Sequence, residues 1–245
     1  MYDDLAAIYD RFIDWPARLG RELGPLTAWL GAARRVADVA CGSGGHSLAL
    51  ARAGYRVTGF DPSVAMLGRA ESQRGELPAT FVPAAFGQLA ERAGEPFEAA
   101  ICLGNSICHL TRRAELEQAV ADLRRLLVPG GRLLLGLRNL TRAAAAGERW
   151  LPLKACCDPD GTEWVFQRRY DYRPGSLVDF TFVALWRAPG QPWRQQAEST
   201  RLRAWPLATW REVFGDWSEM SAAGSLNGEP FDEPASGDLF LTAQA

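Results

Sequence analysis

Hydrophobic and polar positions divide this chain into two kinds of segment. In the first half, short apolar runs alternate with longer stretches whose apolar residues recur every three or four positions. The short runs are typical of buried strands and the longer stretches of amphipathic helices, so the alternation predicts an α/β fold with a parallel sheet. The predicted strands cover residues 36–39, 55–60, 81–84, 98–103 and 132–137, and the predicted helices lie within residues 2–30 (two helices, broken near Trp15 and Pro16), 47–54, 62–70 and 114–127.

The pattern changes after residue 140. A short helix is expected at 143–146, and beyond it strict alternation of apolar and polar positions predicts three strands separated by turns rich in proline and glycine. We interpret residues 141–205 as a small three-stranded antiparallel insertion that covers a ligand crevice. Seven of the nine tryptophans fall at or after Trp150, which predicts an aromatic lining there. The expected strands cover 164–172, 177–186 and 195–203, and a helix at 207–214 and strands at 217–222 and 238–243 follow.

A glycine-rich turn follows the first predicted strand. It contains Gly42, Gly44 and Gly45 and leads into a helix, whose first backbone N–H groups have no partner within the helix. Asp61 ends the second predicted strand, about 20 residues further on, where an acidic side chain accepts hydrogen bonds from ribose hydroxyls in folds of this kind. The sequence therefore predicts a nucleoside-binding site.

Asp38 brings a negative charge to this turn, and no lysine follows the glycines as it does in a phosphate-binding loop. A ligand with an ammonium group near Asp38 is therefore favoured over a pyrophosphate. The spacing Gly42-x-Gly44-Gly45 also departs from the full dinucleotide-binding pattern. Alternatively, Asp38 is a buried carboxylate that only caps the following turn.

Composition narrows the class of partner. The 245 residues, 47% of them hydrophobic, are enough for one domain with a sizeable core. A net charge of −2 without a basic run argues against nucleic acid and leaves a small molecule. No leader peptide or apolar stretch of membrane-spanning length is evident, so we expect a cytoplasmic protein and no membrane partner. Five cysteines without metal-ligand spacing predict reduced thiols, and neither a disulfide framework nor a metal site.

The segment from Val36 to Gly44, with Asp61 ending the second strand, resembles the first two motifs of class I S-adenosylmethionine-dependent methyltransferases. The resemblance implies one domain over residues 1–245, with a doubly wound, Rossmann-like, seven-stranded sheet that is mostly parallel and has an antiparallel last strand. It also implies S-adenosylmethionine as cofactor and S-adenosylhomocysteine as product. Core packing is the alternative for Met66 and for the N-terminal tyrosines. The residues expected to bind the cofactor are Tyr2, Asp38, Ala40, Gly42, Gly44, Asp61, Pro62, Met66, Ala85, Phe86, Leu103, Gly104 and His109.

A second resemblance lies in the fourth predicted strand. The segment from Ile101 to Ser106, with His109 just beyond, is similar to the corresponding segment of glycine/sarcosine N-methyltransferases. By this resemblance Asn105 lies beside the reacting methyl group and orients the nucleophile, and His109 is the first candidate for a general base. Tyr9 is the second candidate, and Tyr9 and Asn105 are both expected to contact the acceptor. A hydrogen-bonded structural role is the alternative for His109.

Arg138 and Asn139 stand at the carboxyl end of a predicted strand, where open α/β sheets bind their ligands. In the glycine/sarcosine enzymes an Arg-Asn pair at this point holds the carboxylate of the acceptor, which the fork of an arginine matches with two hydrogen bonds. The resemblance thus makes Arg138 and Asn139 substrate-binding residues. A surface arginine paired with a nearby glutamate is the alternative.

The sequence departs from those enzymes at Ala85 and Phe86, where the family has Asn-Trp, and in the tryptophan-rich insertion. The oligomeric state stays open. The leading hypothesis is N-methylation of a small amine that carries a carboxylate, such as glycine or sarcosine. Transfer to the oxygen or carbon of a larger acceptor, for example an aromatic one, is the second. A noncatalytic nucleoside binder or an NAD(P)-linked oxidoreductase is the third, because a fold does not fix a function.

Overall fold

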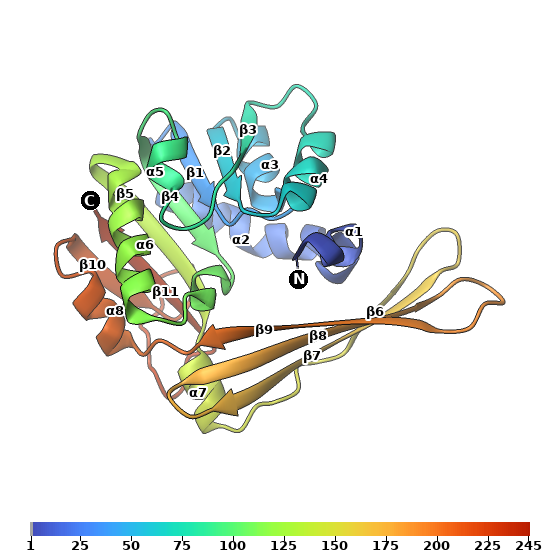
Figure 1. Cartoon of the computed structure of the whole chain (residues 1–245). Helices are drawn as coiled ribbons and strands as arrows, with labels where there is room; N and C mark the ends of the chain where they lie inside the picture. The colour runs from blue at the N-terminus through green and yellow to red at the C-terminus, as the bar shows by residue number, and fades with distance from the viewer. Residues whose placement is uncertain (1) are drawn as a thin grey trace.

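Two sheets organise the structure (Figure 1). The computed structural model describes residues 2–245, and in the first helix it describes the side chains of residue 6 and of those from residue 8 onward. The larger sheet has the order β10-β11-β5-β4-β1-β2-β3, in which β1 to β5 are parallel and β11 is antiparallel to both neighbours. This confirms the predicted doubly wound sheet. Its strands are β1 (Arg35–Val39), β2 (Arg56–Asp61), β3 (Ala79–Pro83), β4 (Phe97–Leu103), β5 (Leu127–Arg138), β10 (Ser218–Ala223) and β11 (Asp238–Gln244).

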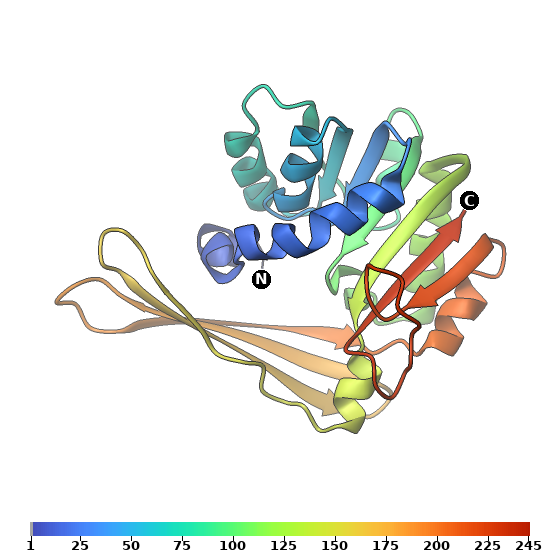
Figure 2. The same ribbon diagram turned by 180° about the vertical axis from the view of Figure 1, so that it is seen from behind.

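Helices cover both faces of the larger sheet (Figure 2). Leu26, Leu30 and Leu50 are buried against one face, and Trp210 and Phe214 against the other. The central strands are buried on both faces, as continuous apolar runs in parallel sheets are. Among the described residues, no helix is both long and apolar enough to cross a membrane. The helices are α1 (Tyr2–Phe12), α2 (Trp15–Leu30), α3 (Gly45–Arg52), α4 (Val64–Arg74), α5 (Leu89–Arg92), the 3₁₀ helix η1 (Ser106–His109), α6 (Arg113–Arg125), α7 (Leu140–Ala145) and α8 (Leu207–Val213).

The second sheet is antiparallel and has the order β6-β7-β8-β9. The sequence predicted three strands here, and that number is wrong because the edge strand β6 (Lys154–Cys157) adds a fourth. β6 has only four residues, all of them exposed, so it shows no apolar alternation by which the sequence pattern would reveal it. The three predicted strands are β7 (Glu163–Arg173), β8 (Leu177–Arg187) and β9 (Arg194–Arg203).

Helix α1 joins the second sheet to the rest of the molecule (Figures 1 and 2). The Arg11 guanidinium lies 2.7 Å from the Asp158 carboxylate in the loop after β6. The ring of Phe12 packs edge-on against Phe166 and Phe182, with centroid distances of 5.8 and 5.1 Å. Because α1 lies between the second sheet and the carboxyl edge of the larger sheet, the space among these three parts is enclosed.

Candidate functional site

The carboxyl ends of β1, β2 and β4 meet at a cavity of about 120 Å³, which we call the inner cavity. Asp38 from β1 and Asp61 from β2 line it. In the turn after β1, Ala40 and Gly42 both have positive φ angles, +57° and +56°. A non-glycine residue in this region carries strain of about 1 kcal/mol, and such strain concentrates at ligand sites.

Asp38 is buried and, among the described residues, forms no ion pair. It accepts a hydrogen bond of 2.6 Å from the hydroxyl of Ser47. Burial raises the pKa of the Asp38 carboxyl, and the nearby His46 and the Ser47 hydrogen bond act in the opposite direction. A buried carboxylate without a cationic partner is costly, so a positive group of a ligand in the inner cavity would complement it.

Asp61 holds the glycine turn in place. One carboxylate oxygen accepts from the backbone N–H of Gly42 at 2.9 Å, and the other accepts from Ser63 N–H at 2.9 Å. An ionised carboxylate only accepts hydrogen bonds, so Asp61, which lines the inner cavity, presents acceptor atoms to the hydroxyls of a ligand. Asp61 therefore fits a ribose while it shapes the turn that surrounds the ligand.

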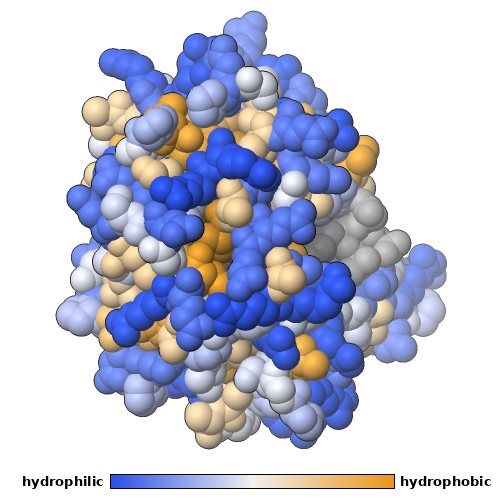
Figure 3. Space-filling view, turned by 60° about the vertical axis from the view of Figure 1, so that its left-hand side comes forward, coloured by the Kyte–Doolittle hydropathy of each residue, from blue (hydrophilic) through white to orange (hydrophobic). Residues whose placement is uncertain are grey.

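A second, apolar cavity of about 270 Å³ continues from the inner cavity and shares Ala40 and Asp61 with it. We call it the ring cavity, because its lining suits a flat apolar ring. Phe86 and Leu89 are its largest apolar side chains, and His109 closes it. On the face in Figure 3, hydrophobic side chains likewise lie at the bottom of a narrow hollow and hydrophilic ones form its rim.

The N-terminal helices close over the glycine turn, as the resemblance to methyltransferases implied. Asp10 of α1 accepts hydrogen bonds from the Ser43 hydroxyl and, at 3.2 Å, from the indole N–H of Trp15, and it pairs with Arg69 of α4 at 2.8 Å. The Trp15 ring lies so close to Gly45 that an added Cβ there would be 2.3 Å from it. Gly45 is thus required for this closure.

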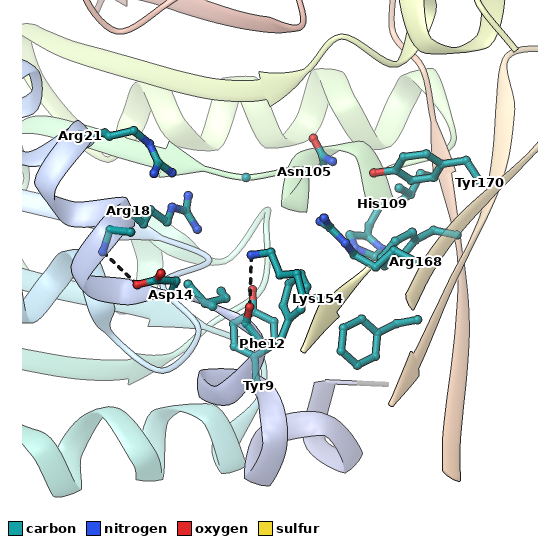
Figure 4. A pocket seen from close by; sticks show the side chains of 16 residues that line it. Tyr9, Phe12, Asp14, Arg18, Arg21, Asn105, His109, Lys154, Arg168 and Tyr170 are labelled. Atoms are coloured by element: carbon teal, nitrogen blue, oxygen red, sulfur yellow. Dashed lines mark hydrogen bonds between the residues drawn. The ribbon is translucent and has the colours of Figure 1, made fainter. Parts of the chain in front are cut away.

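A third cavity of about 530 Å³ lies between α1, α2 and the second sheet, and we call it the outer cavity (Figure 4). Tyr9, Gly104 and Asn105 line both the outer and the inner cavity, so the two meet at these residues. Its other walls come from Phe12, Ile13, Asp14, Ala17, Arg18, Arg21, His109, Lys154, Arg168, Tyr170, Phe180, Phe182 and Leu202.

Of the three predicted catalytic residues, Asn105 and Tyr9 lie at this junction, and His109 lines the outer and the ring cavity. The side-chain oxygen of Asn105 accepts from the backbone N–H of Arg138 at 2.8 Å, which fixes its orientation. Burial lowers the pKa of His109, so its imidazole is neutral at pH 7, and its Nδ1 lies 3.2 Å from the Thr200 hydroxyl. Burial is also the largest cause of the raised pKa of Tyr9, which keeps the phenol protonated.

The structure places Arg138 and Asn139 beside these cavities. The Arg138 guanidinium donates to Glu148 at 2.8 Å and lies 5.9 Å from the ring centroid of Tyr170. Arg138 lines an adjoining cavity of about 250 Å³ that shares Arg18, Gly104, Asn105, Arg168 and Tyr170 with the outer cavity. The Asn139 amide donates to two backbone oxygens and its side-chain oxygen caps α7, so its hydrogen bonds stay within the fold. Acceptor binding by either residue stays a prediction.

The remaining predicted cofactor residues fall into three groups. The Tyr2 side chain lies outside the described part of the structure. Gly44 lines neither cavity; with φ at +81° it caps α3, and an added Cβ would lie 2.8 Å from that of Ala70, so it serves close packing. The others line the inner or the ring cavity: Asp38, Ala40, Gly42, Asp61, Pro62, Met66, Ala85, Phe86, Leu103, Gly104 and His109.

Sequence reasoning missed the cationic residues of the outer cavity, Arg18, Arg21, Lys154 and Arg168. One signal was present. In β7 the positions that share a face are Trp164, Phe166, Arg168, Tyr170 and Tyr172, so Arg168 interrupts an otherwise aromatic row.

Comparisons with known proteins agree with this geometry. Residues 36–131 match a family model described as a methyltransferase domain. The chain is 36% identical over 150 residues to a glycine/sarcosine N-methyltransferase of Parasynechococcus marenigrum. The matched region covers 59% of this chain and 53% of that protein. It is 33% identical over 135 residues to a dTDP-4-amino-2,3,4,6-tetradeoxy-D-glucose N,N-dimethyltransferase of Saccharopolyspora spinosa, covering 52% of each.

Among solved structures, an S-adenosylmethionine-dependent methyltransferase of Clostridium acetobutylicum superposes with a TM-score of 0.78 over 99% of this chain and 98% of that one, at 14% identity. The chain spans about half the length of the curated relatives it matches. The predicted fold and the predicted resemblance to class I methyltransferases are confirmed by these matches.

Proposed function

We propose that this chain, in which residues 36–131 form a methyltransferase domain, binds S-adenosylmethionine and transfers its methyl group to an amine nitrogen of a small molecule. One observation carries the proposal. A closed inner cavity with an unpaired buried carboxylate, Asp38, opens at Gly104 and Asn105 into a separate and larger outer cavity. Two substrates that meet at one point need two adjoining cavities of this kind.

Each part of S-adenosylmethionine has a complementary group in the chain. Asp38 faces the ammonium group, Asp61 accepts from the ribose hydroxyls, and Phe86 in the ring cavity contacts the adenine. The sulfonium methyl group then lies near Gly104 and Asn105, where the inner and outer cavities join.

The cofactor supplies a methyl group already activated by a positively charged sulfur, so the protein's task is alignment and exclusion of water. Asn105, held by the Arg138 backbone, orients the acceptor nitrogen. The neutral His109 imidazole, exposed to the outer cavity, takes up the proton that the amine must lose. Tyr9 covers the junction from α1 and keeps water away from the reacting atoms.

Nitrogen as the acceptor atom is supported by the relatives, whose names describe N-methylation of glycine and sarcosine or of an amino sugar. Residues 141–205 act as the lid over the acceptor. Phe12, Phe180 and Phe182 favour, as second candidate, transfer to an oxygen of an aromatic acceptor. The five free cysteines fit a reducing compartment such as the cytoplasm.

Binding and turnover measured together test this function. Calorimetric titration should show binding of S-adenosylmethionine but not of NAD, and release of S-adenosylhomocysteine should depend on an added amine. The Asp38→Asn variant should lose tight S-adenosylmethionine binding and turnover. The matched surface variant Asp179→Asn, which only breaks pairs with Arg173 and Arg201, should keep binding and turnover. NAD binding in place of S-adenosylmethionine would overturn the proposal.

A further inference from the structure

Three cations line the outer cavity without a carboxylate partner among the described residues. They are Arg21 of α2, Lys154 of β6 and Arg168 of β7 (Figure 4). Their neighbours are paired, since Arg18 lies 3.0 Å from Glu22 and Arg138 lies 2.8 Å from Glu148. The outer cavity thus gathers three cations that form no ion pair with the described residues.

Their charges act on one another. Burial is the largest cause of the lowered pKa of Lys154, and Arg168, Arg18 and Arg21 lower it further, with Asp14 opposing them. Burial and the charge of Arg138 likewise lower the pKa of Arg168. Like charges held together at a partly dehydrated surface destabilise the protein until an anion neutralises them.

The local structure holds these cations in place. Arg168 shares the cavity-facing side of β7 with Phe166 and Tyr170 and stands opposite Phe182 of β8. The Lys154 ammonium and the Arg168 guanidinium each lie 4.7 Å from the ring centroid of Phe12, and Lys154 also donates to the Phe12 carbonyl at 3.3 Å. Contacts of this kind with an aromatic ring fix the direction of a cation without neutralising it.

The sequence adds a further observation. The chain has 27 basic residues, of which Lys154 is the single lysine. It is also placed on the edge strand that sequence reasoning missed, where it reaches into the outer cavity.

The volume of the outer cavity bears on the acceptor's size. At about 530 Å³ it lies within the range of about 300–1,000 Å³ that is usual for drug-sized ligands. Apolar side chains, among them Phe12, Phe180 and Phe182, line the rest of it. A free amino acid as small as glycine would fill only a small part of this volume and would leave most of the apolar lining without contacts.

We propose that Arg21, Lys154 and Arg168 form an anion subsite for the methyl acceptor. The acceptor is then an amine larger than glycine, with an apolar body and a phosphate or carboxylate group at the end remote from the reacting nitrogen. This inference rests on the proposed function, because it assigns the substrate class of the same site.

Lys154 gives a test that does not depend on activity. Acylation of its amine by an amine-selective reagent, located by peptide mapping, reports on the occupancy of the subsite. Inorganic pyrophosphate or citrate, at ionic strength matched with chloride, should slow acylation of Lys154 by about tenfold, because a bound anion holds the amine protonated. The Arg168→Met variant should lose this protection. The matched Arg169→Met variant should keep it, since Arg169 is the next residue of β7, pairs with Asp171 and does not line the outer cavity.

Protection by pyrophosphate alone supports a phosphate-bearing acceptor, and protection by citrate supports a carboxylate-bearing one. Absence of protection by either probe, or equal protection in Arg168→Met, would overturn the anion subsite. Calorimetric binding of S-adenosylmethionine is measured separately, so its failure would count against the proposed function and leave the subsite to be decided by the acylation experiment.

A matched set of amines then tests the acceptor itself. With 6-aminohexyl phosphate, 6-aminohexanoate and 6-aminohexanol, the KM for an anionic amine should be lower than that for the neutral one, and Arg168→Met should remove the difference. Equal KM values for the charged and neutral amines in the native protein would contradict the assignment of the subsite to the acceptor.

Discussion

The two ends of the crevice present different chemical groups to a ligand. At the cofactor end, comprising Asp38, residues 40–45 and Asp61, the groups that face a ligand are backbone atoms of one turn and two buried carboxylates. At the acceptor end, long side chains converge from α1, α2 and all four strands of the second sheet. The first end carries negative charge and the second carries positive charge.

Under the proposed function, this difference in charge lets one crevice separate the cofactor from the acceptor. A ligand with an ammonium group is favoured beside Asp38, and a ligand with an anionic group is favoured beside Arg168, so each is disfavoured in the other's position. The comparison also predicts different responses to substitution. A change at the rigid cofactor end should be costly, whereas a change at the acceptor end should alter one contact among several.

The largest effect is expected from Asp38→Asn. Asparagine keeps the shape of the side chain and still accepts from Ser47, but it removes the buried charge opposite the ammonium group. Affinity for S-adenosylmethionine should fall by roughly 100-fold, or about 3 kcal/mol, as measured by calorimetry. A loss below threefold would show that Asp38 only caps the turn.

The second largest effect is expected from Gly45→Ala. The added Cβ would overlap the Trp15 ring, so α2 must shift, and the free energy of unfolding should fall by about 1–3 kcal/mol. Gly68→Ala is the matched control, because Gly68 lies in α4 with no atom within 4 Å of an added Cβ, and it should be neutral or slightly stabilising. Urea titrations measure both. If Trp15→Ala does not restore stability to Gly45→Ala, the clash is not the cause.

The two ends should respond to pH in opposite directions. Burial raises the pKa of Asp38, and only the ionised carboxylate attracts an ammonium group, so affinity for S-adenosylmethionine should fall as the pH falls through that raised pKa. The pKa of Lys154 is lowered, and only the ammonium form attracts an anion, so pyrophosphate affinity should fall as the pH rises through it. Calorimetry across pH separates the two effects. Asp38→Asn should remove only the pH dependence of S-adenosylmethionine affinity, and Lys154→Met only that of pyrophosphate affinity.

The smallest effect is expected from Arg138→Gln. Its guanidinium already pairs with Glu148 and is only partly buried, so the KM for the acceptor should rise by less than about threefold. Arg168→Gln, which removes an unpaired cation, should raise it more. Initial-rate kinetics with one acceptor decide between them, and a larger effect at Arg138 would favour the sequence-based expectation that Arg138 anchors the acceptor carboxylate.

Sequence-based prediction of which residues lie together was accurate where the signal is local. The glycine turn, Asp38 and Asp61 lie at fixed distances from short apolar runs, and the structure brings them to one cavity. Gly44 shows a limit of this reasoning, because the same spacing that suggests contact with a ligand also serves packing against Ala70. The parallel part of the larger sheet was predictable for the same reason, since β1 to β5 each carry an apolar run of their own.

The rest depends on pairing between distant segments. Arg138 and Glu148 form an ion pair across helix α7, and Asp10 contacts Ser43 at a separation of 33 residues. Neither contact follows from the spacing of apolar positions, and neither does the fact that Arg168 forms no ion pair within the described part of the chain. Charge compensation is a property of the folded surface, so the acceptor end became visible only in three dimensions.

The position of α1 has a kinetic consequence. Its Asp10 contacts the glycine turn, and its Arg11, one residue later, contacts Asp158 at the far end of the second sheet. Withdrawal of α1 from the turn therefore loosens the second sheet in the same movement. Exchange of spent for fresh cofactor should then be gated by residues that never touch it, and the dissociation rate of S-adenosylhomocysteine should respond to Asp158 as much as to the turn.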